Sequence, residues 1–486
     1  MLHAVLAAVT DLHLHRLASG LSGPVIAKWT LFHHVFNWFT FFCAPRTLAN
    51  SVEWALTVIG LANFPWQILC EASIKHVHSW TDSRLCLFAV VCCLIRPTAI
   101  LIWIPICLFH LYHSYRLSPS KPVCKRVQQS SLIRTVMRTY CFIGITSILF
   151  SCLLDRVYFG RWTINQWNFI RFNLLTDGSH VYGVHSWHWY LSSGIPAILW
   201  TQVPFTLIGM IIPVDLCSSC QQHKEEIRYR LSVALTVYEC NDTFFSLSVY
   251  YMRLDVSLLQ VSYVNLLLGH KEFRFLFPLL PLLMYFCGIG TNWLVTRILS
   301  QRWTSVTAVR CLVLFVVCTH VPLALYTSLI HQRGTLDALS ALHRSIVHGK
   351  FGLSQNVKIT ALMPCHSIPS VGYMHLNVSF DQLACDPDLT GWFDGTRAYH
   401  DEADHFYLNP TAWLLNKYKR SATSRPDFIV MFTHLIEAYP SVRNLLMHQW
   451  DYHECGRYFH AHFLTHSRYG NYVVILCHSR DVTLLK

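Results

Sequence analysis

DRVYFGRWTINQWNFIRFNLLTDGSHVYGVHSWHWY, from Asp155 to Tyr190, is the stretch that decides how the chain is arranged. Apolar runs suited to membrane helices flank it on both sides, yet the stretch itself carries acids, arginines, histidines and many aromatic residues. A loop of this composition between two spans favours a place at the bilayer surface, because Trp and Tyr combine an apolar ring with a polar N–H or O–H group. An interfacial aromatic belt is the simplest interpretation of these rings.

The end of this stretch has a composition that a belt alone does not explain. It places two imidazoles among three large aromatic rings: His185, Trp187, His188, Trp189 and Tyr190. This group predicts a pocket for a polar ligand with flat apolar faces, such as a sugar, next to an anion. Ordinary interfacial histidines are the alternative interpretation of His185 and His188.

The overall composition is typical of a multi-pass membrane protein. Of the 486 residues, 53% are hydrophobic and 13% are charged, with a mean hydropathy of +0.34. In an ordinary soluble domain about 25% of residues are charged. The net charge of +12 is no indication of nucleic-acid binding, because the basic residues lie mainly in short loops between apolar runs, where they set orientation.

Several apolar runs are expected to enter the membrane as helices. They are Pro24–Ala44, Thr47–Leu69, Arg84–His113, Tyr140–Leu154, Leu191–Val214, Val256–Gly269, Phe275–Gly290 and Val306–Leu329. Pro97, after Arg96, and Pro105 interrupt the third run, which predicts one broken span or a hairpin of two short ones. Met1–Gly20 is expected to be an amphipathic or frayed segment, and residues 215–262 give no clear pattern.

The basic residues predict which side of the membrane each loop faces. Arg116–Arg138 contains arginines and lysines but no acid, so the positive-inside rule places it in the cytoplasm. The Asp155–Tyr190 stretch then lies on the opposite, luminal side. The same alternation places the cluster HKEFRF, from His270 to Phe275, and everything after His331 on that luminal side as well.

The character of the chain changes near His331, which predicts a membrane domain over residues 1–330 and a small luminal α/β domain over 331–486. The runs Val357–Met363, Phe428–His434 and Tyr472–His478 predict strands. Cys365, Cys385, Cys455 and Cys477 predict one or two disulfides in an oxidising compartment. We predict no metal site: Cys217 and Cys220 form a lone pair, and the acidic residues at 401, 402 and 404 favour a solvated turn.

The cluster HKEFRF is the sharper of the two charged clusters. Lys271 and Arg274 are three residues apart and are expected to share one helix face. Two cations at a membrane boundary favour the binding of a phosphate carried on a lipid. The alternative is that both are snorkelling residues that end a span.

Three motifs together resemble the family of endoplasmic-reticulum mannosyltransferases that use dolichyl-phosphate-mannose: DRVYFGRW (Asp155–Trp162), HSWHWY (His185–Tyr190) and HKEFRFLFPLLPLL (His270–Leu283). Four others look like those of the branch that adds the third mannose of the GPI anchor: HQRGTLD (His331–Asp337), MPCHSIPSVGYMH (Met363–His375), CDPDLTG (Cys385–Gly391) and DEADHFYLNP (Asp401–Pro410). The resemblance implies an α-helical multi-pass fold of the GT-C type.

The resemblance also implies the reaction, which is α-1,2 transfer of mannose with inversion, by a carboxylate base and with cationic help for the departing lipid phosphate. It implies a lipid-linked donor, a GPI glycolipid acceptor, the membrane of the endoplasmic reticulum, and no cofactor. The residues that match the phosphate role are His270, Lys271 and Arg274. Those that match the sugar-binding role are His185, Trp187, His188 and Trp189.

One departure from the family concerns the base. The family's acidic motif, on a luminal loop after the first helix, does not occur in this sequence, which is expected to begin after that loop, and Asp11 is not a substitute. The catalytic residue is therefore unknown. A mannosyltransferase of the dolichol-linked oligosaccharide pathway and a catalytically silent, lipid-binding membrane subunit are the alternative functions.

Overall fold

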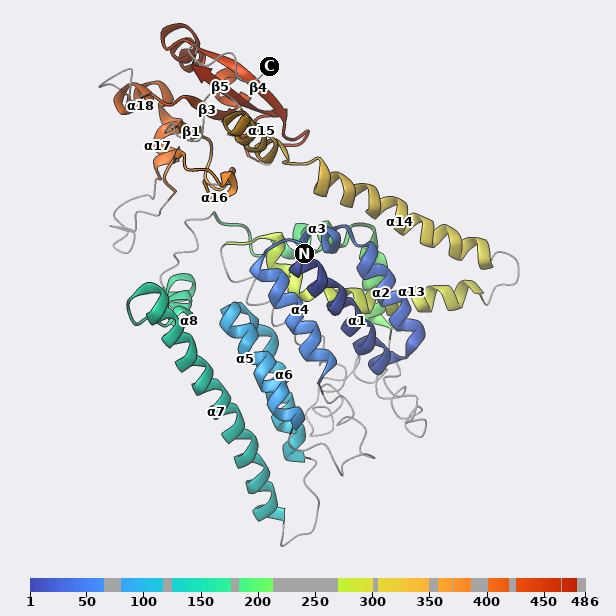
Figure 1. Ribbon diagram of the computed structural model, residues 1–486. Helices are drawn as coiled ribbons and strands as arrows, with labels where there is room; N and C mark the ends of the chain where they lie inside the picture. The colour runs from blue at the N-terminus through green and yellow to red at the C-terminus, as the bar shows by residue number, and fades with distance from the viewer. Residues whose placement is uncertain are drawn as a thin grey trace. The chain divides into compact units, whose positions relative to one another are not determined.

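A computed structural model gives the structure of the chain (Figure 1). It describes residues 1–64, 80–116, 125–175, 183–212, 270–299, 305–348, 357–369, 371–385, 401–418, 425–464 and 466–478. The chain forms two compact units, Met1–Ala324 and Leu325–Lys486. The second unit thus begins shortly before His331, where the sequence predicted the boundary. The unassigned residues 215–262 and the expected span Val256–Gly269 lie outside the described residues.

The N-terminal unit is helical throughout its described part. Its helices are α1 (Leu2–Ser22), α2 (Pro24–Phe36), α3 (Trp38–Cys43), α4 (Ala49–Ala62), α5 (Trp80–Ile95), η3 (Pro97–Ala99), α6 (Ile100–Arg116), α7 (Lys125–Phe159), α8 (Asn165–Ile170), η4 (Arg171–Leu175), η6 (Tyr190–Gly194), α9 (Ile195–Leu199), η7 (Trp200–Gln202), α10 (Val203–Ile211), η9 (Phe273–Leu279), α13 (Leu280–Leu299) and α14 (Ser305–Leu329). Within the described residues, four helical segments are long and apolar enough to cross a membrane: Arg138–Phe159, Tyr190–Ile211, Phe273–Ile298 and Val306–His348. The prediction of a helical multi-pass membrane protein is confirmed.

Helix α13 is the buried centre of this unit. Small residues let its neighbours approach closely: a Cβ on Gly290 would lie 2.0 Å from the Phe205 carbonyl oxygen of α10, and one on Gly288 would lie 2.4 Å from Thr30 Oγ1 of α2. Close backbone approach at small residues is how helices pack when lipid surrounds them. Since η9 leads directly into α13, this packing also fixes the position of η9 in the unit.

The N-terminal segment is not frayed, so that alternative of its prediction is wrong. Residues 2–22 form one regular helix, α1, which buries Leu14, Leu17 and Leu21 against the unit. Two of the polar residues that suggested a frayed segment have partners: Asp11 lies 3.4 Å from Nε2 of the buried His34, and His13 Nδ1 lies 2.8 Å from the Val9 carbonyl oxygen. The expected span Pro24–Ala44 is also divided, into α2 and α3, with Asn37 at the break.

The third apolar run is divided, as its prolines predicted. Helix α5 ends at Ile95, Arg96 is extended, and α6 starts at Ile100 beside α5 (Figure 1). Pro105 lies inside α6 without ending it. The basic segment Arg116–Arg138 was expected to be a loop, but part of it is helical. Helix α7 begins at Lys125 and continues unbroken to Phe159.

The C-terminal unit is a mixed sheet covered by helices. Its elements are α15 (Gly334–His348), β1 (Lys358–Leu362), α16 (Val371–Met374), β2 (Ser379–Gln382), α17 (Glu402–Leu408), α18 (Pro410–Lys417), β3 (Phe428–Phe432), α19 (Thr433–Ala438), α20 (Pro440–Asn444), η11 (Leu445–Gln449), β4 (Tyr452–Phe459) and β5 (Tyr472–His478). The strand order is β2-β1-β3-β5-β4, with β1 parallel to β2 and β3, and with β5 antiparallel to β3 and β4. The predicted α/β fold is confirmed.

Alternate side chains of each central strand enter two different cores. In β3, Phe428 and Val430 pack with α15 on one face, whereas Ile429 and Met431 pack with α17 to α20 on the other. This alternation follows from the period of two along a strand. Two disulfides, Cys365–Cys385 and Cys455–Cys477, link neighbouring segments of the unit. The prediction of one or two disulfides is confirmed, and all four predicted cysteines take part.

Candidate functional site

The cluster HKEFRF enters the unit as extended chain and turns into a helix only at Phe273. Glu272 has φ −138° and ψ 151°, and η9, a 3₁₀ helix, follows it. Lys271 therefore precedes the helix that carries Arg274, and the prediction that these two residues share one helix face is wrong. Lys271 turns inward and is 3% exposed, whereas the Arg274 side chain is 49% exposed.

Glu272 bonds to two basic residues, His270 and Arg274, which lie two residues before and after it. His270 Nε2 lies 2.9 Å from Glu272 Oε1, and Arg274 donates to the same oxygen over 2.7 Å and pairs with Oε2 through Nε. Burial raises the pKa of the Glu272 carboxyl, but the hydrogen bonds and charges of Arg274 and His270 outweigh it and bring that pKa to about 2. Glu272 is thus an anion at neutral pH, held between two donors.

Lys271 is the basic residue that reaches deepest. Its Nζ lies 6.0 Å from the centroid of the Tyr190 ring. Burial lowers the pKa of Lys271, because a charged ammonium is costly away from water. An anion bound next to Lys271 would stabilise the charged ammonium and offset the cost of its burial.

The aromatic segment before η6 lies against the start of η9. The Trp189 ring is 4.8 Å from the His185 ring, stacked at 24°, and 4.8 Å from the Phe273 ring. On the other side of this contact, His270 Nδ1 lies 3.3 Å from the Gly183 carbonyl oxygen. The structure therefore brings together two groups of predicted site residues that are far apart in sequence.

The other two predicted sugar-binding residues face elsewhere. Trp187 is 68% exposed and meets His188 edge-on at 5.5 Å. His188 Nδ1 lies 3.1 Å from Ser192 Oγ in the next turn. Among the described residues, the partners of these two side chains are each other and Ser192, so they lie beside the Trp189–Phe273 contact and do not form part of it.

Asn50, Glu53 and Arg96, which do not stand out as site residues in the sequence, hold η9 in place. Asn50 Nδ2 of α4 donates to the Arg274 carbonyl oxygen over 2.8 Å. Glu53 of the same helix pairs with Arg96, with 3.2 Å between Oε2 and Nη1, and the Arg96 guanidinium lies 5.3 Å from the Phe275 ring centroid. A sequence signal existed, because a charged residue in an apolar run is costly unless it has a partner.

This arrangement suits a ligand that combines an anion with a flat polar body. Arg274 and Lys271 offer positive charge, one at the surface and one inside, and guanidinium groups match phosphate geometry well. The stacked rings of His185 and Trp189 offer an aromatic face next to that charge. A sugar phosphate on a lipid has both features.

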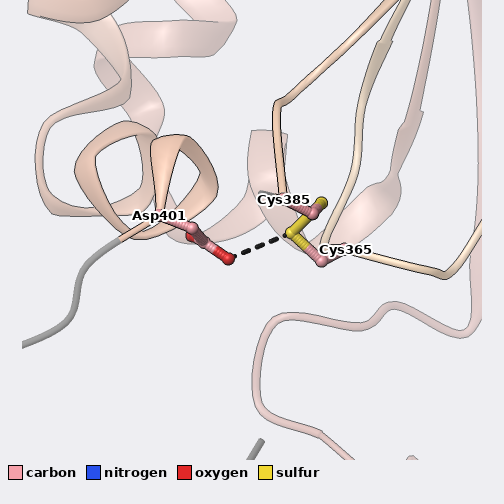
Figure 2. A group of neighbouring side chains, drawn as sticks. All are labelled: Cys365, Cys385 and Asp401. Atoms are coloured by element: carbon pink, nitrogen blue, oxygen red, sulfur yellow. Dashed lines mark hydrogen bonds between the residues drawn. A yellow bond between two sulfur atoms is a disulfide. The ribbon is translucent and has the colours of Figure 1, made fainter. Parts of the chain in front are cut away.

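The cysteine and acid group near α17 has a different role. Figure 2 shows Cys365 and Cys385 joined as a disulfide, with the Asp401 carboxylate directed at the Cys365 sulfur, 3.1 Å away. These three residues have ligand atoms close enough for a metal ion, but disulfide sulfurs are not thiolate ligands. Asp401 also caps α17 by accepting from Asp404 N over 2.6 Å, which fits the predicted turn.

The comparisons with known proteins agree with the motifs. The family model of the Alg9-like mannosyltransferase family matches residues 1–375. GPI alpha-1,2-mannosyltransferase 3 of Mus musculus is 32% identical over 460 residues, which cover 95% of this chain and 70% of that protein. The proteins of the same name in Xenopus laevis and Homo sapiens are 34% and 32% identical, and each match covers 97% of this chain, with 73% and 71% of those proteins. The predicted resemblance is confirmed, and the chain belongs to the Alg9-like mannosyltransferase family.

Proposed function

We propose that this chain is a GPI mannosyltransferase of the endoplasmic-reticulum membrane. It takes mannose from dolichyl-phosphate-mannose and adds it, through an α-1,2 link, as the third mannose of the GPI-anchor precursor. The relatives named GPI alpha-1,2-mannosyltransferase 3 support this substrate pair. The observation that carries the proposal is the contact of Trp189 with Phe273, which unites an aromatic surface with the basic cluster.

The basic cluster receives the donor's phosphate. In the transfer, the bond between the mannose C1 and the phosphate oxygen breaks while C1 bonds to the acceptor oxygen, whose proton passes to a carboxylate base. Dolichyl phosphate leaves with increased negative charge, which Arg274, Lys271 and His270 stabilise. The side chains supply the positive charge that a divalent cation would otherwise provide, so chelation with EDTA is expected to leave transfer unchanged. No residue of this chain is assigned as the base.

The aromatic segment receives the mannose. His185 and Trp189 present stacked rings to the apolar face of the sugar, and Trp187 and His188 lie next to them at the open side. The positive-inside rule places these residues, and the C-terminal unit, on the luminal side. The two disulfides of that unit support the same side, because they form in oxidising compartments.

A complementation experiment tests this function. Cells that lack the third GPI mannosyltransferase receive either the chain as given or a form that carries the family's acidic luminal loop, and GPI-anchored protein at the surface is counted by flow cytometry. We expect rescue by the form with the loop. Failure of both forms, with both present in the membrane, would contradict the proposal; rescue of a strain defective in the dolichol-linked oligosaccharide pathway would favour that alternative.

The phosphate-binding role predicts the effect of single substitutions in an active form. Arg274→Ala and Lys271→Ala are each expected to lower turnover about a hundredfold, since each removes a charge aimed at the departing phosphate. Arg457→Gln is the matched control, because Arg457 is an exposed arginine that pairs with Glu454 on an edge strand of the other unit. Mannose transfer by both alanine variants at the control's rate would remove these residues from the phosphate site.

A further inference from the structure

Glu53 and Arg96 form a buried ion pair inside the N-terminal unit, within runs that are otherwise apolar. Their side chains are 3% and 16% exposed, and Arg96 Nη1 lies 3.2 Å from Glu53 Oε2. Desolvating such a pair costs several kcal/mol per ion, and apolar side chains of the same volume often stabilise a fold as well or better. Packing alone therefore gives a poor account of this pair.

The pair is connected to the phosphate site through one aromatic ring. Arg96 and Arg274 place their guanidinium carbons 5.3 Å and 5.8 Å from the centroid of the Phe275 ring. The His270 ring meets the same ring edge-on at 5.8 Å. Three basic side chains thus surround Phe275, and two of them belong to the proposed phosphate site.

Helix α4 also holds the backbone of η9 directly. Asn50, one turn before Glu53, donates to the Arg274 carbonyl oxygen over 2.8 Å. The side of α4 that faces η9 therefore makes two connections, one to the main chain of Arg274 and one through Glu53 and Arg96 to Phe275. Together these connections determine the position of the Arg274 backbone and the orientation of the Phe275 ring.

We propose that Glu53 and Arg96 are positioning residues for the donor-phosphate site, an inference that rests on the proposed function. Glu53 keeps the Arg96 guanidinium in place at a depth where an unpaired cation would be costly. Arg96 in turn holds the Phe275 ring by a cation–π contact. The ring contacts both His270 and Arg274 and, together with Glu272, which bonds to both, sets their separation. A displacement of about 1 Å in such groups can lower a rate about a hundredfold.

Paired substitutions separate positioning from packing. Glu53→Gln and Arg96→Met each leave one charge without its partner, so each is expected to lower the yield of folded protein as well as activity. The double variant removes both charges, so its thermal unfolding temperature is expected to return towards the unsubstituted value. Its kcat/KM for dolichyl-phosphate-mannose and its affinity for dolichyl phosphate are nevertheless expected to stay about 10- to 100-fold lower.

Two further variants complete the test. Arg96→Lys keeps a cation for Glu53 but not the planar group over Phe275, so we expect normal folding and a partial loss of donor affinity. Thr291→Val is the control, because it removes the 2.7 Å contact of Thr291 Oγ1 with His33. Thr291 lies beyond the end of η9 by about 17 Å along α13, at 1.5 Å per residue. It is expected to change stability but not donor affinity.

Each outcome decides the inference. A double variant with the unsubstituted kcat, KM and dolichyl phosphate affinity would overturn it. Should the double variant fail to fold, unchanged donor affinity in Arg96→Lys would overturn it instead. If the protein transfers no mannose, binding of dolichyl phosphate still separates the claims. Binding that weakens in the variants would sustain the positioning role while the proposed function falls, and absence of binding would overturn both.

Discussion

At the scale of single residues, Glu272 decides how much charge the site presents. It binds Arg274 and His270 together, and these partners outweigh its burial and bring its pKa to about 2. Because this pKa lies below the ordinary value of 4.5, the ion pairs stabilise the fold fully above that value and are lost as the pH falls towards 2. Changes of pH in the neutral range therefore act on other groups.

Lys271 is the group that gives the site a pH dependence. Burial lowers its pKa. Affinity for dolichyl phosphate is therefore expected to fall as the pH rises through that lowered pKa. The phosphate itself, with a second pKa near 6, no longer titrates in alkaline solution. Lys271→Arg keeps its proton over this range and is expected to flatten the decline. Titration of dolichyl phosphate binding measures both, and an equal decline in the two proteins would contradict the role of Lys271.

The sequence identified these residue types but not their geometry. The spacing of Lys271 and Arg274 predicts a shared helix face, but the chain is extended at Glu272 and η9 starts only at Phe273. The Glu272 carboxylate bonds to His270 and Arg274. Glu53 and Arg96 were not selected, because their pairing joins segments that are far apart in sequence. Each is a solitary charge in an apolar run, and this is the signal that could have found them.

At the scale of elements, Asn37 holds the break between α2 and α3. Its side-chain oxygen accepts from the N–H groups of Phe39 and Thr40, and its Nδ2 donates to Ile198 and Gln202. Asn37→Ala is expected to lower stability by more than the roughly 1 kcal/mol of a lost helix cap, since buried groups also lose their partner.

Asn37→Ser provides the comparison, because a serine hydroxyl can also cap a helix by accepting from its N–H groups and brings no charge into this buried position. We expect the unfolding temperature in detergent to fall less for Ser than for Ala. An alanine variant as stable as the unsubstituted protein would show that the break does not depend on this side chain.

Strands in the middle of the sheet could be predicted, and those at its edges could not. β1, β3 and β5 are continuous apolar runs with buried faces on both sides. β2 and β4 are the edge strands and are only partly buried, so their sequences, SFDQ and YHECGRYF, lack the apolar run that marks a strand. The sequence alone could not distinguish helix α1 from a frayed segment, because the partner of Asp11 lies on another helix.

At the scale of the whole molecule, the cysteines divide between the two units. Both disulfides belong to the C-terminal unit, whereas the free cysteines among the described residues all belong to the N-terminal one.

If the C-terminal unit is luminal, its four bridged cysteines should resist maleimide–polyethylene glycol in denatured, unreduced protein and react after reduction. Cys365→Ser should free Cys385 alone, and it should destabilise the unit by about 2–4 kcal/mol. Full labelling without a reductant would contradict a luminal domain.

Photo-crosslinking shows whether the segments around Trp189 and Arg274 together bind a mannosyl phospholipid. A dolichyl phosphate analogue with a photoreactive group at the phosphate is bound to the membrane-embedded protein, irradiated, and its attachment sites are read by mass spectrometry. Our account predicts label in both residues 183–192 and 270–275, reduced by Arg274→Ala and by excess dolichyl phosphate. Label confined to other parts of the chain, or unaffected by that substitution, would contradict it.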